Sequence, residues 1–161
     1  MFKTADLCDN HYDSGELQIC HPFFSDFGGK KKFYGKIHTI HCFEDNSKVR
    51  EAVARKGKGC VLVIDAGASL RCAMLGDLLA AKAVKNGWEG IIMNGLIRDT
   101  EDIAKMDLGV KALGTFPLKS VKRDLGTHNI PIAFAGVHFV PGDYLYADED
   151  GIICSPQSLL K

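Results

Sequence analysis

The sequence predicts an α/β fold, with a parallel βαβ core and added antiparallel strands. Two uninterrupted apolar runs, at residues 60–64 and 90–93, flank an Ala-rich segment with helical periodicity. Strands that alternate with helices in this way form parallel sheets. After Pro117, short strand-like segments separated by Gly and Pro fill the chain, which indicates antiparallel pairs added to that layer.

Length and charge exclude several classes of protein. The chain has 161 residues, 46% of them hydrophobic and 25% charged, so we expect one domain, residues 1–161, that buries about 70% of its unfolded surface. The 20 basic and 20 acidic residues cancel, and a neutral chain lacks the field that non-specific nucleic-acid binding requires. The short basic clusters at residues 30–32 and 119–123 are interpreted as solvated loops.

The chain carries no signal for a membrane or for secretion. No apolar stretch approaches the length of a membrane span, and the first 20 residues lack the apolar segment of a secretory signal. Six cysteines are scattered without a C-x-x-C pair, and several lie inside apolar runs. We therefore expect a cytoplasmic protein with reduced, mostly buried thiols.

Alternation and composition place the elements of the first half. Residues 33–43 (FYGKIHTIHCF) alternate and are rich in aromatic and β-branched side chains, so they predict a strand. Asn46 and Ser47 can cap a helix over residues 48–56. Residues 60–64 (CVLVI) contain no polar interruption, which is typical of a strand buried on both faces.

The second half follows the same signals. Residues 78–86 predict a helix, because the segment is rich in Ala and places Leu79, Ala83 and Val84 on one apolar stripe. Gly87 follows it and is a common residue just after a helix end. Residues 90–93 predict the next buried strand, which ends at Asn94 and Gly95. The remaining expected elements are a helix at residues 99–105 and strands at residues 110–116, 132–135, 137–140, 144–147 and 151–155.

The candidate site lies where two parallel strands end, because ligands of open α/β sheets bind outside the carboxyl ends of the strands. Arg98 and Asp99 follow the second buried strand. The helix that joins the two strands is predicted to begin within the segment Gly76, Asp77, Leu78 and Leu79. The first N–H groups of a helix have no internal partner and the helix dipole is positive there. Residues 76–79 therefore predict a cradle for a carboxylate.

The side chains after the strand suit an oxyanion and a cation. Arg98 can make a bidentate contact to a planar oxyanion, and Asp99 can bind a divalent cation such as Mg²⁺. Asp102, four residues after Arg98, can hold the guanidinium. The alternative is structural, with Asp99 capping a helix and Asp102 completing a capping-box variant. In that alternative, Gly76 is only a helix entry.

The combination resembles a known signature. Asp77, then Arg98 and Asp99 after twenty intervening residues, then Asp102 match the pattern of class II pyruvate aldolases related to 4-hydroxy-4-methyl-2-oxoglutarate aldolase. These enzymes share a fold with the regulator of ribonuclease activity A, RraA. The resemblance extends over the chain in the stretches TADLCDNH, FSDFGGKKKFYGKIHTIHCFEDN, VLVIDAGAS, NGWEGIIMNGLIRD and GDYLYADEDGII. It implies a swivelling β/α domain, usually in a ring-shaped homotrimer with the active site at the subunit boundary.

The resemblance also implies a role for each site residue. The backbone of residues 76–79 holds the pyruvyl carboxylate, and Arg98 contacts the carboxylate or keto oxygen. Asp99 binds Mg²⁺ or Mn²⁺ directly, Asp77 helps through water on the metal, and Asp102 is a supporting acid. We expect metal-bound water to act as the base, since the cation lowers its pKa, and no lysine Schiff base is required.

The function so implied is a metal-dependent carbon–carbon lyase. It cleaves 4-hydroxy-4-methyl-2-oxoglutarate to pyruvate and decarboxylates oxaloacetate, because both reactions pass through a metal-stabilised pyruvate enolate. The chain resembles the short family form, without the C-terminal extension that supplies an acidic group across the subunit interface. The alternative is a non-catalytic trimeric regulator that binds an RNA-degrading endonuclease, and both functions can coexist on one fold.

Other motifs are weaker. His38 and His41 are three residues apart on a predicted strand, so they point to opposite faces and are not expected to share a metal. Residues 65–69 (DAGAS) resemble part of a dinucleotide loop but lack G-x-G-x-x-G. Trp88 is interpreted as packing at a helix-to-strand turn.

Overall fold

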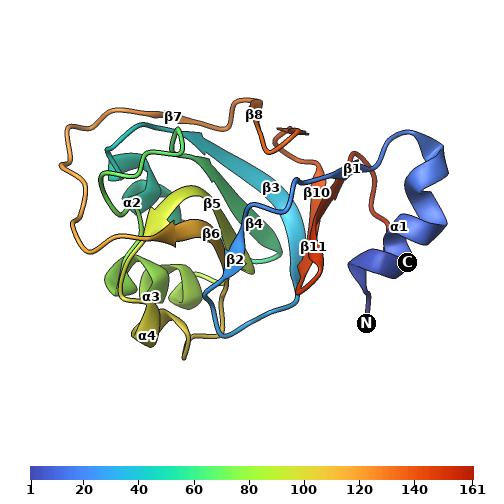
Figure 1. Cartoon of the computed structure of the whole chain (residues 1–161), viewed down its shortest axis with the longest axis horizontal. Helices are drawn as coiled ribbons and strands as arrows, with labels where there is room; N and C mark the ends of the chain where they lie inside the picture. The colour runs from blue at the N-terminus through green and yellow to red at the C-terminus, as the bar shows by residue number, and fades with distance from the viewer.

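A curled mixed sheet of nine strands forms the body of the molecule, beside a two-stranded hairpin (Figure 1). This computed structural model describes all of residues 1–161. The strand order is β1-β11-β10-β3-β4-β5-β6-β2, and β7 pairs with the end of β3.

The strands are β1 (Gln18–Ile19), β2 (Ser25–Asp26), β3 (Phe33–His41), β4 (Cys60–Asp65), β5 (Gly90–Ile97), β6 (Gly109–Thr115), β7 (Thr127–His128), β8 (Ile132–Phe134), β9 (Val137–Phe139), β10 (Tyr144–Asp148) and β11 (Gly151–Ser155). The helices are α1 (Thr4–His11), α2 (Ser47–Val53), α3 (Asp77–Lys85) and α4 (Thr100–Ile103), with a 3-10 turn η1 (Tyr12–Ser14).

The centre of the sheet is parallel. Strands β3, β4, β5 and β6 pair in parallel in that order, and α2, α3 and α4 connect successive strands. On one side β10, β11 and β1 continue the sheet in antiparallel pairs, and on the other β2 ends it in an antiparallel pair with β6. The predicted α/β fold, a parallel βαβ core with added antiparallel strands, is therefore confirmed.

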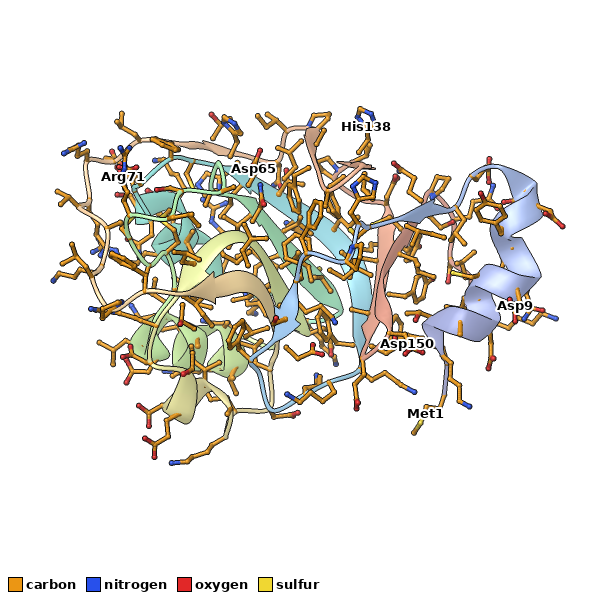
Figure 2. The ribbon with its side chains drawn as sticks, in the orientation of Figure 1. Met1, Asp9, Asp65, Arg71, His138 and Asp150 are labelled. Atoms are coloured by element: carbon orange, nitrogen blue, oxygen red, sulfur yellow. The ribbon has the colours of Figure 1, made fainter.

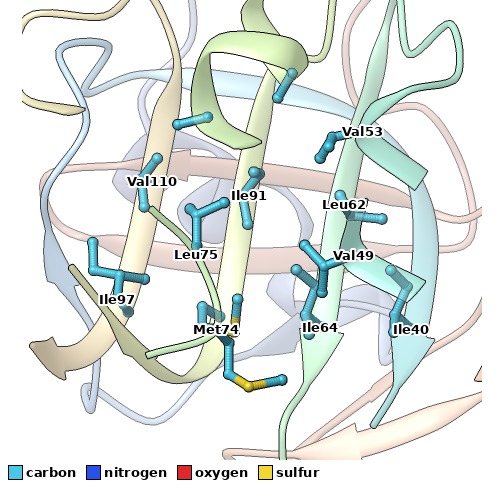
Figure 3. Close-up of a cluster of buried hydrophobic side chains, with 14 of the residues drawn as sticks. Ile40, Val49, Val53, Leu62, Ile64, Met74, Leu75, Ile91, Ile97 and Val110 are labelled. Carbon is cyan, nitrogen blue, oxygen red and sulfur yellow. The ribbon is translucent and has the colours of Figure 1, made fainter. Parts of the chain in front are cut away.

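Both faces of the central strands are buried, as the apolar runs predict. Leu62 and Ile64 of β4 belong to the larger core cluster, which includes side chains of α2 and α3 (Figure 3). Val61 and Val63 belong to a second cluster with side chains of the β8–β9 hairpin. All four are at most 1% exposed, and each such burial contributes roughly 1.5–3 kcal/mol. One uninterrupted run thus contributes to two cores.

Helix α1 stands apart from the other helices, beyond the β11 edge of the sheet (Figure 1). Its Leu7 packs with Phe2, Tyr146 and Ile153 in a third, smaller cluster. None of the helices has the length and apolarity needed to cross a membrane.

The cysteines are unpaired, as predicted. All six are free thiols, and four of them are buried, namely Cys20, Cys42, Cys72 and Cys154. Burial raises the pKa of Cys20 and of Cys42 to about 12. These thiols therefore stay protonated and are weak nucleophiles.

The clearest difference from the sequence prediction is at the end of β5. The strand continues past Asn94 to Ile97, with a register shift against β6 between Met93 and Leu96. Leu96 and Ile97 are buried, so the apolar run resumes after a local bulge. This continuation carries the chain closer to the start of α3.

Candidate active site

The predicted site residues lie at the carboxyl end of the parallel strands. In Figure 2, Asp65 marks this end of β4, and Asp150, in the turn between β10 and β11, marks the opposite end of the sheet. The loop after β4 leads to α3, and the chain after β5 leads to α4. The site is built where these two connections meet.

A short extended segment, residues 73–75, joins the two connections. The Met74 N–H donates to the Leu96 carbonyl oxygen over 2.8 Å, and the Arg98 N–H donates to the Leu75 carbonyl oxygen over 2.9 Å. These backbone bonds place the start of α3 beside the end of β5. Gly76 therefore lies next to Arg98, as the cradle prediction requires.

Asp99 does not cap the helix that follows it. It occupies the N-cap position of α4 with a left-handed backbone, φ +57°, and makes no side-chain cap bond there. Its Oδ2 instead accepts a hydrogen bond from the N–H of Asp77, the first residue of α3, over 3.0 Å. The left-handed conformation costs about 1–2 kcal/mol in most residues, less in Asp. The capping alternative is therefore wrong for α4, and the carboxylate faces the predicted cradle.

The space around residue 76 is too small for any side chain, so glycine is required there. A Cβ atom at this position would lie 2.7 Å from Oδ2 of Asp99 and 3.4 Å from Nε of Arg98. Its φ of −127° is open to any residue, so backbone conformation does not demand glycine. The absence of a side chain lets the Asp99 carboxylate and the Arg98 guanidinium reach the helix start.

The first three N–H groups of α3 differ in their partners. The Asp77 N–H donates to Asp99, and the Leu78 N–H donates to Oδ1 of Asp77 over 2.9 Å. The Leu79 N–H has no hydrogen-bond partner in the chain. Two donors of the predicted cradle are thus occupied by the protein's own carboxylates, which is the chemical group the cradle is expected to bind.

Arg98 is only loosely held. Its Nη1 donates to the carbonyl oxygen of Pro117 over 3.4 Å, and its Nε lies 3.8 Å from Oδ2 of Asp99. Asp102 is exposed on α4 and forms no ion pair with Arg98, so the expected contact between them is not found. The guanidinium, with 37% of the side chain exposed, keeps donors free for a ligand.

A pocket of about 550 Å³ contains the cradle together with Arg98 and Asp99. Two carboxylates line it, those of Asp77 and Asp99. Six cationic side chains line it as well: Arg50, Lys82, Lys85, Arg98, Lys119 and Lys122. This excess of positive charge favours an anionic ligand.

Sequence reasoning missed most of these cations. Lys119 and Lys122 were predicted as part of a solvated loop, and both are exposed, but both line the pocket. The five cations other than Arg98 come from α2, from α3 and its end, and from the loop after β6. No local pattern in the sequence indicates that such distant segments share one pocket.

Asp45 holds the basic loop in place. This buried carboxylate accepts hydrogen bonds from the N–H and hydroxyl of Ser47 and from the N–H groups of Arg123 and Leu125. Burial alone would raise the pKa of Asp45, but these four hydrogen bonds lower it to about 2. The charged carboxylate thus fixes the loop that carries Lys122.

The carboxylates fit a hydrated divalent cation. The chain has no group of three or more His, Cys, Asp or Glu side chains that could hold a metal, so a closed protein cage is absent. Mg²⁺ commonly takes one or two carboxylates and fills the remaining positions with water and substrate oxygens. Oδ1 of Asp99 accepts no hydrogen bond in the chain, and Asp77 lies beside it.

A second pocket, of about 500 Å³, lies at the other side of the sheet, next to α1 and β2. It contains none of the predicted site residues. Its one lysine, Lys111, is buried and paired with Asp26 over 3.1 Å. The cation is thereby neutralised, so this pocket lacks the positive excess of the first.

The sequence matches a protein family over nearly its whole length. The model of the RraA-like family, described as Aldolase/RraA, matches residues 4–154. A Pseudomonas fluorescens (strain Pf0-1) protein named "Putative 4-hydroxy-4-methyl-2-oxoglutarate aldolase" is 54% identical over 158 residues, 98% of this chain and 96% of that protein. An Azotobacter vinelandii protein of the same name is 55% identical, with the same coverage.

Solved structures have the same fold. A Geobacillus kaustophilus HTA426 structure, described as an S-adenosylmethionine: 2-dimethylmenaquinone methyltransferase, has a TM-score of 0.95 and 46% identity and covers 98% of this chain and 97% of its own. The structure of the RNA-processing inhibitor RraA from Thermus thermophilis has a TM-score of 0.94 and 38% identity and covers 100% of this chain and 98% of its own.

Proposed function

The chain belongs to the RraA-like family, Aldolase/RraA, and we propose that it is a divalent-metal-dependent lyase. Its proposed substrate is 4-hydroxy-4-methyl-2-oxoglutarate, which it cleaves to pyruvate, with decarboxylation of oxaloacetate as a second activity. One observation carries the proposal. Asp77, Arg98 and Asp99 meet at the N-terminus of α3, where the Leu79 N–H has no partner, in a cationic pocket.

The start of α3 would bind the 1-carboxylate of the substrate. The Leu79 N–H is free, and the Leu78 N–H is held only by the neighbouring Asp77 carboxylate. A substrate carboxylate would take both donors and release Asp77 toward the solvent side of the pocket. The helix dipole favours this exchange, since it stabilises negative charge at the N-terminus.

Arg98 would stabilise the charge that develops in the reaction. In aldol cleavage the C3–C4 bond breaks, and its electron pair passes into the enolate of the pyruvyl fragment. The guanidinium has Nη2 free and a long contact to Asp99, so it can turn toward the C2 oxygen of the enolate. A donor positioned at a developing oxyanion contributes roughly 2.7–4 kcal/mol to catalysis.

Proton transfers complete the cleavage. The C4 hydroxyl loses its proton to a water molecule in the pocket and becomes the keto group of one product, and C3 of the enolate takes up a proton to become the methyl group of the other. Oxaloacetate yields the same enolate when CO₂ leaves, with no hydroxyl proton to remove. Both reactions therefore need the enolate site, and only the aldol cleavage needs the base.

Asp99 would hold a divalent cation through Oδ1, and Asp77 would support it through water. When bound, Mg²⁺ or Mn²⁺ supplies a Lewis acid for the enolate charge. The proposal rests on the two neighbouring carboxylates and requires a cation that keeps most of its waters.

The test is pyruvate release from both substrates with Mg²⁺, Mn²⁺ or EDTA. Wild type should turn over both substrates with metal and neither with EDTA, and Asp99→Ala should lose both activities. Turnover by Asp99→Ala equal to wild type would refute the site. No turnover by wild type with any metal would refute the lyase proposal.

A second candidate function is regulation of an RNA-degrading endonuclease. It is supported by the similarity to the Thermus RNA-processing inhibitor over the whole chain. Inhibition of RNA cleavage by the purified endonuclease in the presence of this protein would support it. Absence of binding at micromolar concentration would count against it.

We also propose that the protein forms a homotrimer whose interface borders the pocket. The loops beside the pocket carry four apolar side chains that are each at least 60% exposed, namely Leu70, Leu118, Val121 and Leu125. Exposed apolar side chains grouped in this way favour a protein interface. Light scattering after size-exclusion chromatography should give three times the chain mass of 17.6 kDa.

The methyltransferase description of the Geobacillus structure is not proposed for this chain. The segment at residues 65–69 (DAGAS) does not have the glycine pattern of a loop that binds a nucleoside cofactor such as S-adenosylmethionine. The cationic pocket described above also favours an acid over a cofactor that carries a positively charged sulfonium.

A further inference from the structure

One buried acceptor in the molecule has no partner. Among all buried side-chain oxygen and nitrogen atoms, only Oδ1 of Asn46 makes no hydrogen bond. Asn46 is 6% exposed, and it lines the same pocket as Gly76, Arg98 and Asp99. An unsatisfied buried acceptor is costly, so a group that the chain does not supply is expected to donate to it.

The orientation of the amide is fixed by its other end. Nδ2 of Asn46 donates to the carbonyl oxygen of Met74 over 3.2 Å. A flipped amide would place Oδ1 against that carbonyl oxygen, and two acceptors repel each other. The free atom is therefore the oxygen.

The position of Asn46 makes the free oxygen more unusual. Asn46 is at the N-cap of α2, where an asparagine commonly accepts a hydrogen bond from the helix, but its side chain makes no cap bond. Asp45 takes that role by accepting from the N–H and hydroxyl of Ser47. The Asn46 side chain thus makes no hydrogen bond to the start of its own helix.

The donor to Oδ1 is a water molecule or a hydroxyl group, because the other groups of the pocket and of the substrate do not supply one. The lysine and arginine side chains of the pocket make no hydrogen bond to Oδ1, and the carboxylate and keto groups of the proposed substrate only accept. The reaction does require a water molecule, because the C4 hydroxyl must lose its proton. Water donates two hydrogen bonds, so it can donate to an amide oxygen while a lone pair faces the hydroxyl.

We propose that Asn46 is a positioning residue whose Oδ1 holds the water that takes the C4-hydroxyl proton of the substrate. This inference rests on the lyase function proposed above. The proton passes from the hydroxyl oxygen to the water oxygen, the C4–O bond becomes a carbonyl, and the C3–C4 electron pair leaves in the enolate. The water then returns a proton to C3, which becomes the methyl group of pyruvate. Asn46 itself neither gains nor loses a proton.

The inference predicts a selective defect. Aldol cleavage needs the hydroxyl proton removed, whereas decarboxylation of oxaloacetate does not. Loss of Oδ1 should therefore lower kcat for 4-hydroxy-4-methyl-2-oxoglutarate by at least about tenfold, given that general bases typically contribute 10²–10⁴-fold. The KM for this substrate and both constants for oxaloacetate should change less than about threefold, since the carboxylate and enolate sites are intact.

The experiment compares kcat and KM for both substrates, with Mg²⁺, in wild type and two variants. Asn46→Ala removes the acceptor oxygen. Ser120→Ala is the matched structural control, because the Ser120 hydroxyl accepts from the backbone N–H of Asn46 over 3.2 Å. The ratio of aldolase to decarboxylase kcat should fall in Asn46→Ala only.

Four results would overturn the inference. An equal loss of both activities in Asn46→Ala would mean a structural role, and a raised KM with unchanged kcat would mean a contact to the substrate itself. A ratio that also falls in Ser120→Ala would separate the effect from the acceptor. If wild type turned over neither substrate, the lyase proposal would fall and this inference with it; the first three results leave the lyase proposal standing.

Discussion

Asp99 and Asp77 are joined by a hydrogen bond from the backbone N–H of Asp77 to Oδ2 of Asp99, 3.0 Å long. The bond links the residue after β5 to the first turn of α3. It leaves Oδ1 of Asp99 free beside the Asp77 side chain. The Asp99 carboxylate thus accepts a hydrogen bond from the start of α3 through one oxygen and can bind a cation through the other.

Asp99→Asn should separate these two roles. The amide keeps an acceptor oxygen for the Asp77 N–H and tolerates the left-handed backbone, so the melting temperature should change by less than about 2 °C, but metal-dependent turnover should fall at least about 100-fold. Asp99→Ala should lose turnover and also about 1 kcal/mol of stability, which is 2–4 °C at this chain length. Pyruvate release at saturating Mg²⁺ and thermal unfolding measure these two effects; full turnover by Asp99→Asn would contradict the role of the charge.

Gly76→Ala should abolish most activity while the protein stays folded. The new Cβ would lie 2.7 Å from Oδ2 of Asp99, so the carboxylate must move, and a displacement of about 1 Å in a catalytic group can cost about 100-fold in rate. Gly151→Ala is the control, because a Cβ there meets nothing within 4 Å. Pyruvate release should fall in the first variant and remain at the wild-type level in the second.

Arg98→Lys should lower kcat for both substrates by about 100-fold or more. A lysine keeps the charge but loses the planar pair of donors that suits an enolate or carboxylate. Arg71→Lys is a matched control, since Arg71 pairs with Glu44 outside the pocket. Steady-state kinetics at saturating Mg²⁺ distinguish the two, and equal rates for wild type and Arg98→Lys would contradict the enolate role.

The Asp45 carboxylate should make the free energy of unfolding fall at low pH. Its pKa in the folded protein is about 2, below the value near 3.9 of an unfolded aspartate. Its contribution is therefore complete above about pH 4 and is lost as the pH falls toward 2. Urea unfolding between pH 7 and pH 2 should show this loss in wild type, and Asp45→Asn should show a smaller dependence over the same range together with lower stability at pH 7.

Long apolar runs made most of the fold predictable. Residues 60–64 and 90–93 predict the central strands because burial on both faces leaves no polar positions. The two-residue strands β1, β2 and β7 have no periodicity to detect. The sequence predicts a strand end after Met93, where the structure has a bulge, because Asn94 and Gly95 are also typical of turns.

The site was predictable only in part. Asp77, Arg98 and Asp99 stand at strand and helix ends, where local rules apply, and the structure brings them together. Asn46 and the lysines of the pocket arrive through long-range packing, for which a single sequence holds no signal. The Asp99 carboxylate accepts a hydrogen bond from the start of α3 and not from α4, and this also depends on a contact between distant segments.

The extended segment at residues 73–75 has a consequence for how this pocket can diversify. Ala73 bridges Leu96 on one side and Lys119 on the other through main-chain groups alone. Any residue except proline can make such bonds. The side chain at 119 can therefore be exchanged without loss of the backbone bonds that hold its segment, so point mutations there offer a direct route to acids of different size and charge.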